Sequence, residues 1–316
     1  MQYRLWKGRK ISVIGLGTAH FGGQVAAGLA ADMLDAYLAL GGNLIDTARV
    51  YGDFAGHRLG ESEKVIGRWL ERQRREDIFL STKGGHPDME HMEISRLSPA
   101  EILDDAARSL DNLRVESVDI YFLHRDDPAR PVSQIAETLQ EIVEKGMAKH
   151  VGVSNWTVGR IREMNEYAAA HGLAGAEINQ IQMSLARQER LIDPTLIYMD
   201  QEGEKWHRET GMPLFAFSSQ AGGYFSKLRS LGPEGLPEAL RIQYDSPDNR
   251  AIADRLEAVC RETGYSPATA SLAYLTAQPF PVYPLVGASR LSQVEAIADA
   301  GDAALTPAQR DFLRVI

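Results

Sequence analysis

Three ionisable side chains, each at the end of a short apolar run, and one nearby phenol have the clearest potential for chemistry. Asp46, Lys83 and His124 close or follow runs typical of buried strands, and Tyr51 comes five residues after Asp46. If these runs are neighbouring parallel strands, about 4.8 Å apart, we expect the three residues to lie at equivalent heights on one edge. Ionisable groups are costly to bury unless they are paired, so three together indicate a functional cluster.

The residue types in this cluster fit proton transfer to a carbonyl oxygen. Asp46 would pair with Lys83 and keep its ammonium group charged. A charged Lys83 beside Tyr51 would lower the pKa of that phenol from about 10. Tyr51 would then donate a proton to a developing alkoxide, while His124 orients the carbonyl group. We therefore expect the cluster to polarise a ketone or aldehyde that receives a hydride.

Each of these residues taken alone also has a purely structural interpretation. Asp46 could cap a turn, Tyr51 could pack within a loop, and Lys83 could be a solvated strand end. All of them falling by coincidence at matching positions is much less plausible, so the prediction depends on the combination.

Composition excludes several classes of protein. The chain has 316 residues, 44% of them hydrophobic and 24% charged, with a net charge of −9. That charge argues against a nucleic-acid partner, and no run of 18 apolar residues predicts a membrane span. The single cysteine, Cys260, excludes an internal disulfide framework and a Cys-rich zinc site. We expect a soluble, cytoplasmic protein without a metal site.

Short apolar runs recur along the chain at intervals of one strand–helix unit. Eight such units favour an α/β fold of the closed (β/α)8 TIM-barrel type over the alternative, an open doubly wound sheet. A single barrel domain would then span residues 1–316. The predicted strands are Val13–Gly15, Asn43–Asp46, Ile78–Thr82, Val118–Leu123, His150–Val153, Ala176–Gln180, Pro213–Phe217 and Val282–Val286.

Helical patterns lie between most of these runs. Ser98-Pro99-Ala100-Glu101 predicts a capped helix start, because it combines a serine N-cap, a proline at the first position and a glutamate three residues after the serine. The predicted helices are Leu29–Leu40, Glu61–Arg72, Ser98–Leu113, Val132–Lys145, Val158–Ala170, Asp248–Thr263, Ala268–Gln278, Leu291–Ala300 and a last one from Thr306.

Two segments do not fit the regular alternation. Residues Tyr3–Leu5 and Lys10–Ser12, turning at Gly8, predict an N-terminal β-hairpin that closes the bottom of the barrel. The long interval from Phe217 to Val282 predicts an insertion after the seventh strand, with at least one extra helix. We interpret it as a long loop over the barrel mouth.

At these positions the sequence resembles the aldo-keto reductase superfamily from about residue 3 to residue 300. The resemblance is specific because many short motifs match in order. They are Gly15-Leu16-Gly17-Thr18, Asn43-Leu44-Ile45-Asp46-Thr47-Ala48, Tyr51-Gly52, Gly60-Glu61-Ser62-Glu63, Ser81-Thr82-Lys83, Asp119-Ile120-Tyr121-Phe122-Leu123-His124 and Gly152-Val153-Ser154-Asn155.

The resemblance implies roles for individual residues. It makes Tyr51 the general acid/base, tuned by Lys83 and Asp46, and makes His124 the residue that positions the carbonyl. It also implies a nicotinamide cofactor bound without a Rossmann domain. The implied cofactor-binding residues are Gly17, Thr18, Asp46, Ser154, Asn155, Gln180, Phe217, Ser218, Ser219, Gln220, Gly287, Ser289, Arg290 and Gln293.

Cofactor preference follows from one of these residues. Arg290 matches the position that meets the adenosine ribose, and a guanidinium is a good donor to a 2′-phosphate, so we expect NADP(H) to be preferred over NAD(H). Two departures weaken the match. The family commonly has Glu-Asn where this chain has Ala296-Ile297, and Ser219-Gln220 replaces a usual Pro-Leu.

The substrate pocket should be lined by loops after several strands, and we expect it to take a small carbonyl or alcohol compound. Polar residues after the fourth strand favour a hydroxylated, sugar-like compound. The candidate pocket residues are His20, Phe21, Phe54, Arg125 and Trp156.

Two other functions are compatible with the same residues. One is a Schiff-base lyase that uses Lys83 as nucleophile, although the Asp46 partner argues for a charged lysine. The other is a redox sensor or regulatory subunit that binds cofactor and turns over slowly. The sequence leaves the oligomeric state open.

Overall fold

The computed structural model of the chain describes residues 1–52, 59–190 and 193–314. Eight parallel strands form a closed barrel in the order β10-β3-β4-β5-β6-β7-β8-β9, so the predicted barrel is confirmed. The strands are β3 (Gly15–Gly17), β4 (Leu44–Asp46), β5 (Phe79–Gly84), β6 (Val118–Leu123), β7 (Ala148–Ser154), β8 (Ile178–Gln182), β9 (Leu214–Phe217) and β10 (Val282–Gly287).

The strands are apolar throughout because both of their faces are buried. In β6, Ile120 and Phe122 belong to a cluster that fills the barrel interior. Their neighbours Tyr121 and Leu123 point outward and pack with the surrounding helices. This alternation is the two-residue period of a strand, here with a core on each side.

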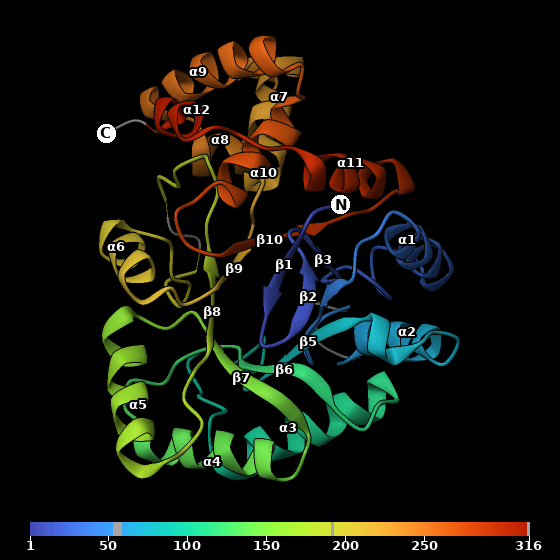
Figure 1. Cartoon of the computed structure of the whole chain (residues 1–316), viewed down its shortest axis with the longest axis vertical. Helices are drawn as coiled ribbons and strands as arrows, with labels where there is room; N and C mark the ends of the chain where they lie inside the picture. The colour runs from blue at the N-terminus through green and yellow to red at the C-terminus, as the bar shows by residue number, and fades with distance from the viewer. Residues whose placement is uncertain (53–58, 191–192, 315–316) are drawn as a thin grey trace.

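The predicted N-terminal hairpin is confirmed as β1 (Tyr3–Trp6) paired antiparallel with β2 (Arg9–Ser12). It lies in front of the barrel strands in Figure 1. The Trp6 ring lies 6.1 Å from the Phe79 ring and 4.7 Å from the His150 ring, measured between centroids. The hairpin therefore closes the end of the barrel at which the strands begin.

Every helix that the sequence predicted is present. Ser98 and Glu101 form a reciprocal capping box at the start of the third helix, as their spacing predicts. The helices that precede β9 or begin after residue 263 are α1 (Ala27–Ala39), α2 (Glu61–Leu70), α3 (Pro99–Leu113), α4 (Val132–Glu144), α5 (Val158–His171), α6 (Gln201–Thr210), α10 (Pro267–Thr276), α11 (Leu291–Asp302) and α12 (Pro307–Leu313).

The insertion after β9 corrects one expectation. Besides α9 (Pro247–Thr263), which matches the predicted helix Asp248–Thr263, it holds α7 (Tyr224–Leu231) and α8 (Glu238–Tyr244), where a long loop was expected. These helices gather with α12 beyond α10 at the top of Figure 1. The physical reason is a second apolar core, in which Tyr224 and Tyr244 pack with outward-facing residues of β8 and β9. None of the helices in the described part of the chain combines the length and the apolar character that crossing a bilayer requires.

Candidate active site

The four residues predicted to do chemistry come from three adjacent strands. Asp46 ends β4, Lys83 lies near the end of β5, and His124 directly follows β6. Tyr51 lies in the segment after β4, where the amide of Arg49 donates to the carbonyl of Lys83 at 2.9 Å. The closed barrel therefore brings all four to the edge where its strands end.

The expectation that Asp46, Lys83 and His124 lie at equivalent heights is wrong, because the strand register offsets them. Asp46 pairs with Ser81, two residues before Lys83, and Lys83 pairs with Phe122, two residues before His124. Lys83 thus lies two residues beyond the partner of Asp46, and His124 lies two residues beyond the partner of Lys83. This offset arises because the strands of a closed barrel are tilted and staggered. A step of two residues keeps the side chains on the same side of the sheet.

Asp46 and Lys83 form a buried ion pair at the centre of the site. Lys83 Nζ donates to Asp46 Oδ2 at 2.7 Å and to the carbonyl of Thr47 at 2.7 Å. The other carboxylate oxygen accepts from Ser81 Oγ at 2.7 Å and from Gln180 Nε2 at 3.0 Å. Both charges are therefore paired and hydrogen-bonded, which is the condition for burying them.

The pair keeps the ammonium group protonated. Burial lowers the pKa of Lys83, but Asp46 and Tyr51 act in the opposite direction and the net pKa is raised. A Schiff-base nucleophile needs an unprotonated amine. The geometry therefore argues against the lyase alternative.

Tyr51 corrects a second expectation. Lys83 Nζ lies 4.7 Å from the centroid of its ring, as the predicted tuning requires. Burial raises the pKa of Tyr51, however, and the lowering influence of Lys83 is smaller than that of burial. Asp46 opposes Lys83 because it favours the neutral phenol. Tyr51 is therefore an uncharged proton donor whose pKa lies above its usual value. The sequence had predicted a pKa lowered toward neutral pH.

Gly52 allows the segment that carries Tyr51 to lie against α2. Its φ of 110° is in the region that favours glycine, and a Cβ there would lie 2.7 Å from both Glu61 Cβ and the Ser62 amide nitrogen. The Ser62 amide donates to the carbonyl of Tyr51 at 3.2 Å. The first turn of α2 thus fixes the backbone of the proton donor.

His124 is held by its backbone and by ring packing. Its amide donates to the carbonyl of Gly84 at 2.8 Å, and its ring contacts those of Tyr51 and His86 at centroid distances of 5.7 and 4.8 Å. Its Nδ1 is buried and has no hydrogen-bond partner among the described residues. Burial lowers the pKa of His124 well below its usual value, with His86 and Arg125 adding to the effect. The imidazole is therefore neutral.

His86 is a site residue that sequence reasoning missed. The residue is 8% exposed, its Nδ1 lies 2.7 Å from the carbonyl of Pro87, and burial lowers its pKa to about 4. The signal that could have found it is its position three residues after Lys83, where the chain leaves β5.

The residues predicted to hold a nicotinamide carboxamide lie at the same edge. All three are buried: Ser154 ends β7, Asn155 follows it, and Gln180 lies within β8, two residues before its end. Asn155 has a φ of 61°, and its Nδ2 donates to the carbonyl of His124 at 3.2 Å. Its Oδ1 accepts from the Ile197 amide at 3.2 Å. The structure thus gathers these polar groups beside the ion pair.

Gly17 and Thr18 also meet the ion pair through its backbone. Gly17 pairs with Asp46 in the β3–β4 register. The amide and Oγ1 of Thr18 donate to the carbonyl of Asp46 at 3.1 and 3.0 Å. These two residues therefore help to fix the backbone that carries the carboxylate.

The remaining predicted cofactor residues follow β9 and β10. Phe217 is half-buried at the end of β9, followed by exposed Ser218, buried Ser219 and half-buried Gln220. Ser219 Oγ donates to the carbonyl of Leu285 in the neighbouring strand at 2.8 Å.

The segment after β10 is open to the approach of a ligand. A Cβ at Gly287 would meet only the Gly17 carbonyl oxygen, at 3.9 Å. The amide of Ser289 donates to Gln293 Oε1 at 2.7 Å, and Arg290 is exposed immediately before α11. The polar rim, the open backbone and the exposed arginine fit an extended dinucleotide.

The predicted substrate residues are placed differently from one another. His20 is exposed, whereas Phe21 and Trp156 are 0% and 1% exposed. Trp156 Nε1 donates to the carbonyl of Arg125 at 3.2 Å, and Arg160 covers its ring at 5.3 Å. Phe54 lies outside the described residues.

Arg125 is buried and bonded to the loop after β8. Its Nη2 lies 3.3 Å from Asp193 Oδ2, and its Nε donates to Thr195 Oγ1 at 3.0 Å. The neighbouring acid, Asp126, pairs with Arg160 at 3.3 Å. The polar groups expected to face a substrate therefore bond largely to other protein groups.

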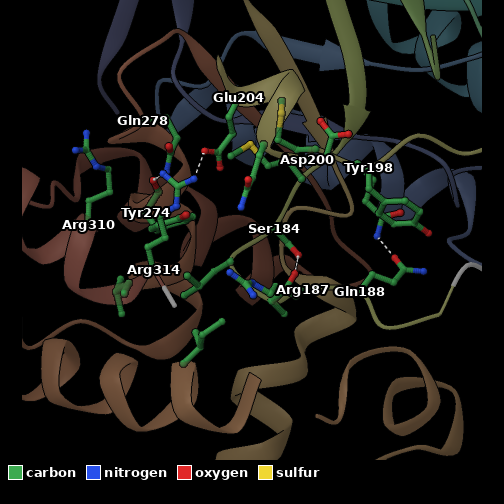
Figure 2. Close-up of a pocket in the computed structure, with 18 of the residues that line it drawn as sticks. Ser184, Arg187, Gln188, Tyr198, Asp200, Glu204, Tyr274, Gln278, Arg310 and Arg314 are labelled. Atoms are coloured by element: carbon green, nitrogen blue, oxygen red, sulfur yellow. Dashed lines mark hydrogen bonds and ion pairs between the residues drawn. The ribbon is translucent and has the colours of Figure 1, made fainter. Parts of the chain in front are cut away.

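A large cavity lies apart from the four chemical residues. Its volume is about 960 Å³, and none of Asp46, Tyr51, Lys83 and His124 lines it. Residues of α6, α10 and α12 line it, and Arg314 Nη2 lies 2.6 Å from Glu204 Oε2, a pair that Figure 2 shows among the lining residues. This cavity is therefore not part of the candidate active site.

Comparison with known proteins supports the assignment that the geometry favours. Residues 13–314 match the model of the Aldo/keto reductase family. The chain belongs to the aldo/keto reductase family. It is accordingly an NAD(P)H-dependent oxidoreductase.

Individual relatives are distant. The enzyme is 27% identical over 308 residues to norsolorinic acid reductase stcV of Emericella nidulans, covering 92% of this chain and 74% of the relative. It is 27% identical over 275 residues to 6-dehydroglucose reductase of Novosphingobium aromaticivorans, covering 86% and 80%.

Solved structures share the fold. A thermostable aldo-keto reductase in complex with epalrestat superposes with a TM-score of 0.72 at 22% identity, covering 99% of this chain and 98% of the other. An aldo-keto reductase from Klebsiella pneumoniae in complex with NADPH gives 0.72 at 21% identity, covering 97% and 91%.

Proposed function

We propose that the enzyme reversibly reduces an aldehyde or ketone to an alcohol with NADP(H), and that Tyr51 is its general acid/base. The observation that carries this proposal is the buried Asp46–Lys83 ion pair, with Nζ 2.7 Å from Oδ2 and 4.7 Å from the centroid of the Tyr51 ring. A fixed ammonium beside a phenol stabilises the negative charge that the phenol gains when it donates its proton.

The proton moves from Tyr51 Oη to the carbonyl oxygen as that oxygen becomes an alkoxide. In the oxidative direction Tyr51 accepts the proton from the alcohol. His124, which burial keeps neutral, donates a hydrogen bond to the same oxygen. Lys83 stays protonated throughout, because Asp46 and the Thr47 carbonyl hold its ammonium group.

A bound nicotinamide dinucleotide supplies or accepts the hydride. Ser154, Asn155 and Gln180 would hold its carboxamide, and Phe217 would stack on the nicotinamide ring. The remaining contacts of the dinucleotide are assigned to Gly17, Thr18, Asp46, Ser218, Ser219, Gln220, Gly287, Ser289, Arg290 and Gln293.

NADP(H) is preferred over NAD(H) in this proposal. The exposed Arg290 at the start of α11 supports the preference, because a guanidinium binds a phosphate through charge-assisted hydrogen bonds. The Klebsiella pneumoniae structure with NADPH is consistent with it.

The substrate is a small carbonyl compound, and pocket contacts are assigned to His20, Phe21, Phe54, Arg125 and Trp156. The relatives are named as a norsolorinic acid reductase and a 6-dehydroglucose reductase, so their named substrates differ from one another. A panel should therefore include aromatic aldehydes, ketones and oxidised sugars.

The test is stopped-flow oxidation of enzyme-bound NADPH by this panel, with NADPH and NADH affinities measured by fluorescence titration. We expect rapid oxidation by at least one carbonyl compound and tighter binding of NADPH. Tight NADPH binding without oxidation by any compound would instead favour the redox-sensor alternative. Covalent trapping at Lys83 by borohydride would favour the lyase.

A further inference from the structure

A group of buried hydroxyls adjoins the Asp46–Lys83 ion pair. Its members are Thr18 after β3, Thr47 after β4 and Ser62 in the first turn of α2, and all three residues are 0% exposed. Ser62 Oγ lies 3.0 Å from Thr47 Oγ1 and 2.9 Å from both the Oγ1 and the carbonyl oxygen of Thr18. We call these three residues the hydroxyl cluster.

The direction of each hydrogen bond in the cluster follows from the number of protons. A hydroxyl group carries one donor hydrogen and can accept at two lone pairs. Thr18 Oγ1 donates to the carbonyl of Asp46 at 3.0 Å, so it accepts from Ser62. Ser62 has then used its own hydrogen, and it accepts from Thr47. The donors therefore run in one direction along the hydroxyl cluster and end on the main chain of Asp46.

Both halves of the proposed proton-transfer site are bonded to Ser62 or its cluster. The carbonyl of Thr47, which accepts from Lys83 Nζ at 2.7 Å, belongs to the peptide group next to that of Asp46. The amide of Ser62 donates to the carbonyl of Tyr51 at 3.2 Å. Ser62 therefore uses its hydroxyl for the segment of the ion pair and its amide for the segment of the phenol.

The turn that carries Ser62 is also anchored to β5. The neighbouring Glu63 is 0% exposed, and its carboxylate oxygens accept from Thr82 Oγ1 at 2.6 Å and from Asn112 Nδ2 at 3.0 Å. Thr82 directly precedes Lys83 in β5. This anchor does not involve the hydroxyl cluster. Loss of the Ser62 hydroxyl should therefore release the segments after β3 and β4 without detaching α2.

We propose that Ser62 is a positioning residue whose hydroxyl fixes the Asp46–Lys83 ion pair relative to the phenol of Tyr51. The proposal rests on the proposed carbonyl reductase activity. A displacement of about 1 Å at the reacting groups can lower a rate roughly 100-fold, because reaction requires a close and aligned geometry. Since Ser62 acts through other residues, its loss should slow the chemical step and leave binding of the carbonyl compound nearly unchanged.

The test compares Ser62→Ala with Ser12→Ala in single turnovers at saturating NADPH, with a carbonyl compound that the parent enzyme reduces. Ser12 is the matched control at the other end of the barrel. It is also 0% exposed, and its Oγ lies 3.0 Å from Tyr37 Oη and accepts from the Asn43 amide at 3.1 Å.

We expect the maximal rate to fall roughly tenfold in Ser62→Ala, while the concentration of carbonyl compound that gives half of this rate changes less than about twofold. Ser12→Ala should keep the parent rate although it also loses stability in urea unfolding. A merely structural role of Ser62 would give the same result as Ser12, namely lost stability with the parent rate.

Amide hydrogen exchange of the cofactor-free protein provides a readout that does not need turnover. The amide of Thr18 donates to the carbonyl of Asp46 at 3.1 Å. It should exchange faster in Ser62→Ala than in the parent protein, and at the parent rate in Ser12→Ala.

The outcomes separate the positioning role from the proposed function. Reduction by Ser62→Ala at the parent rate would overturn the positioning role and leave the proposed function standing. If the parent enzyme reduces no carbonyl compound, the proposed function fails. Faster exchange would then still support the link made by the Ser62 hydroxyl, and unchanged exchange would overturn it. If Ser62→Ala does not fold, Thr47→Val, which removes the donor to Ser62, should show the same loss of rate, and the parent rate would overturn the proposal.

Discussion

Lys83 Nζ lies 2.7 Å from Asp46 Oδ2, and the two side chains are 0% and 3% exposed. A pair buried this deeply contributes little net stability when intact, because desolvation offsets the attraction. Removing one partner is different, since it leaves the other charge buried and unpaired.

This relationship predicts strong coupling between the two positions. Asp46→Asn or Lys83→Met alone should each lower the free energy of unfolding by about 3–5 kcal/mol. The double variant should lose clearly less than the sum of the two, because no unpaired charge is left. Urea unfolding of the four proteins measures the coupling, and additive losses would contradict the structure.

The pH dependence of reduction follows from the two proton-bearing groups. Burial raises the pKa of Tyr51, so its acid form persists above about pH 10. Burial lowers the pKa of His124, so this residue stays neutral well below about pH 6.5. We expect kcat/KM for reduction to stay level between about pH 6.5 and 10. An inflection near pH 6.5 that disappears in His124→Asn would show that the imidazole titrates there instead.

Stability should fall in mild acid because of His86. Its folded-state pKa is about 4, below its ordinary value of 6.5, so the unfolded chain takes up the proton first. The stability that His86 contributes is therefore present above about pH 6.5 and is lost as pH falls toward 4. The loss that His86 causes in the free energy of unfolding is about 3 kcal/mol.

His86→Phe keeps a ring against His124 and removes the titration. The free energy of unfolding, measured by denaturant at a series of pH values, should then decline less between pH 6.5 and 4 than in the parent protein. If the free energy of unfolding fell equally with pH in the two proteins, His86 would not be held neutral in the folded state.

Cofactor preference should depend on Arg290. Arg290→Met removes the donor assigned to the 2′-phosphate, so the ratio of NADH to NADPH dissociation constants should fall roughly tenfold. Fluorescence titration measures both constants, with Arg72→Met as the charge control. Equal weakening of both cofactors would place Arg290 elsewhere on the dinucleotide.

The sequence was sufficient for the barrel because each strand is a short apolar run at a regular interval. It missed α6, although Asp200 accepts from the Gly203 amide as an N-cap and Gly211 ends the helix with a φ of 69°. The many charged residues of that helix hide its apolar side. Of the helices after β9, α9 and α10 were predicted, whereas α7 and α8 were taken for part of a loop because their apolar faces pack on a second core that only the fold reveals.

The candidate site was predictable in its members but not in its electrostatics. Strand ends identify Asp46, Lys83 and His124, whereas the stagger of the barrel sets their register. The sign of the Tyr51 pKa shift depends on how deeply the phenol is enclosed, and residue types do not carry that information. The ring contact of His86 with His124 cannot be read from spacing either.

The central claim is that Tyr51 donates the proton to the reduced carbonyl. The most direct measurement is a single turnover in the stopped flow, in which Tyr51→Phe loaded with NADPH is mixed with a carbonyl compound that the parent enzyme reduces. We predict a rate at least about 100-fold lower than the parent rate, with the dissociation constant for NADPH nearly unchanged. Oxidation of NADPH at the parent rate would contradict the account.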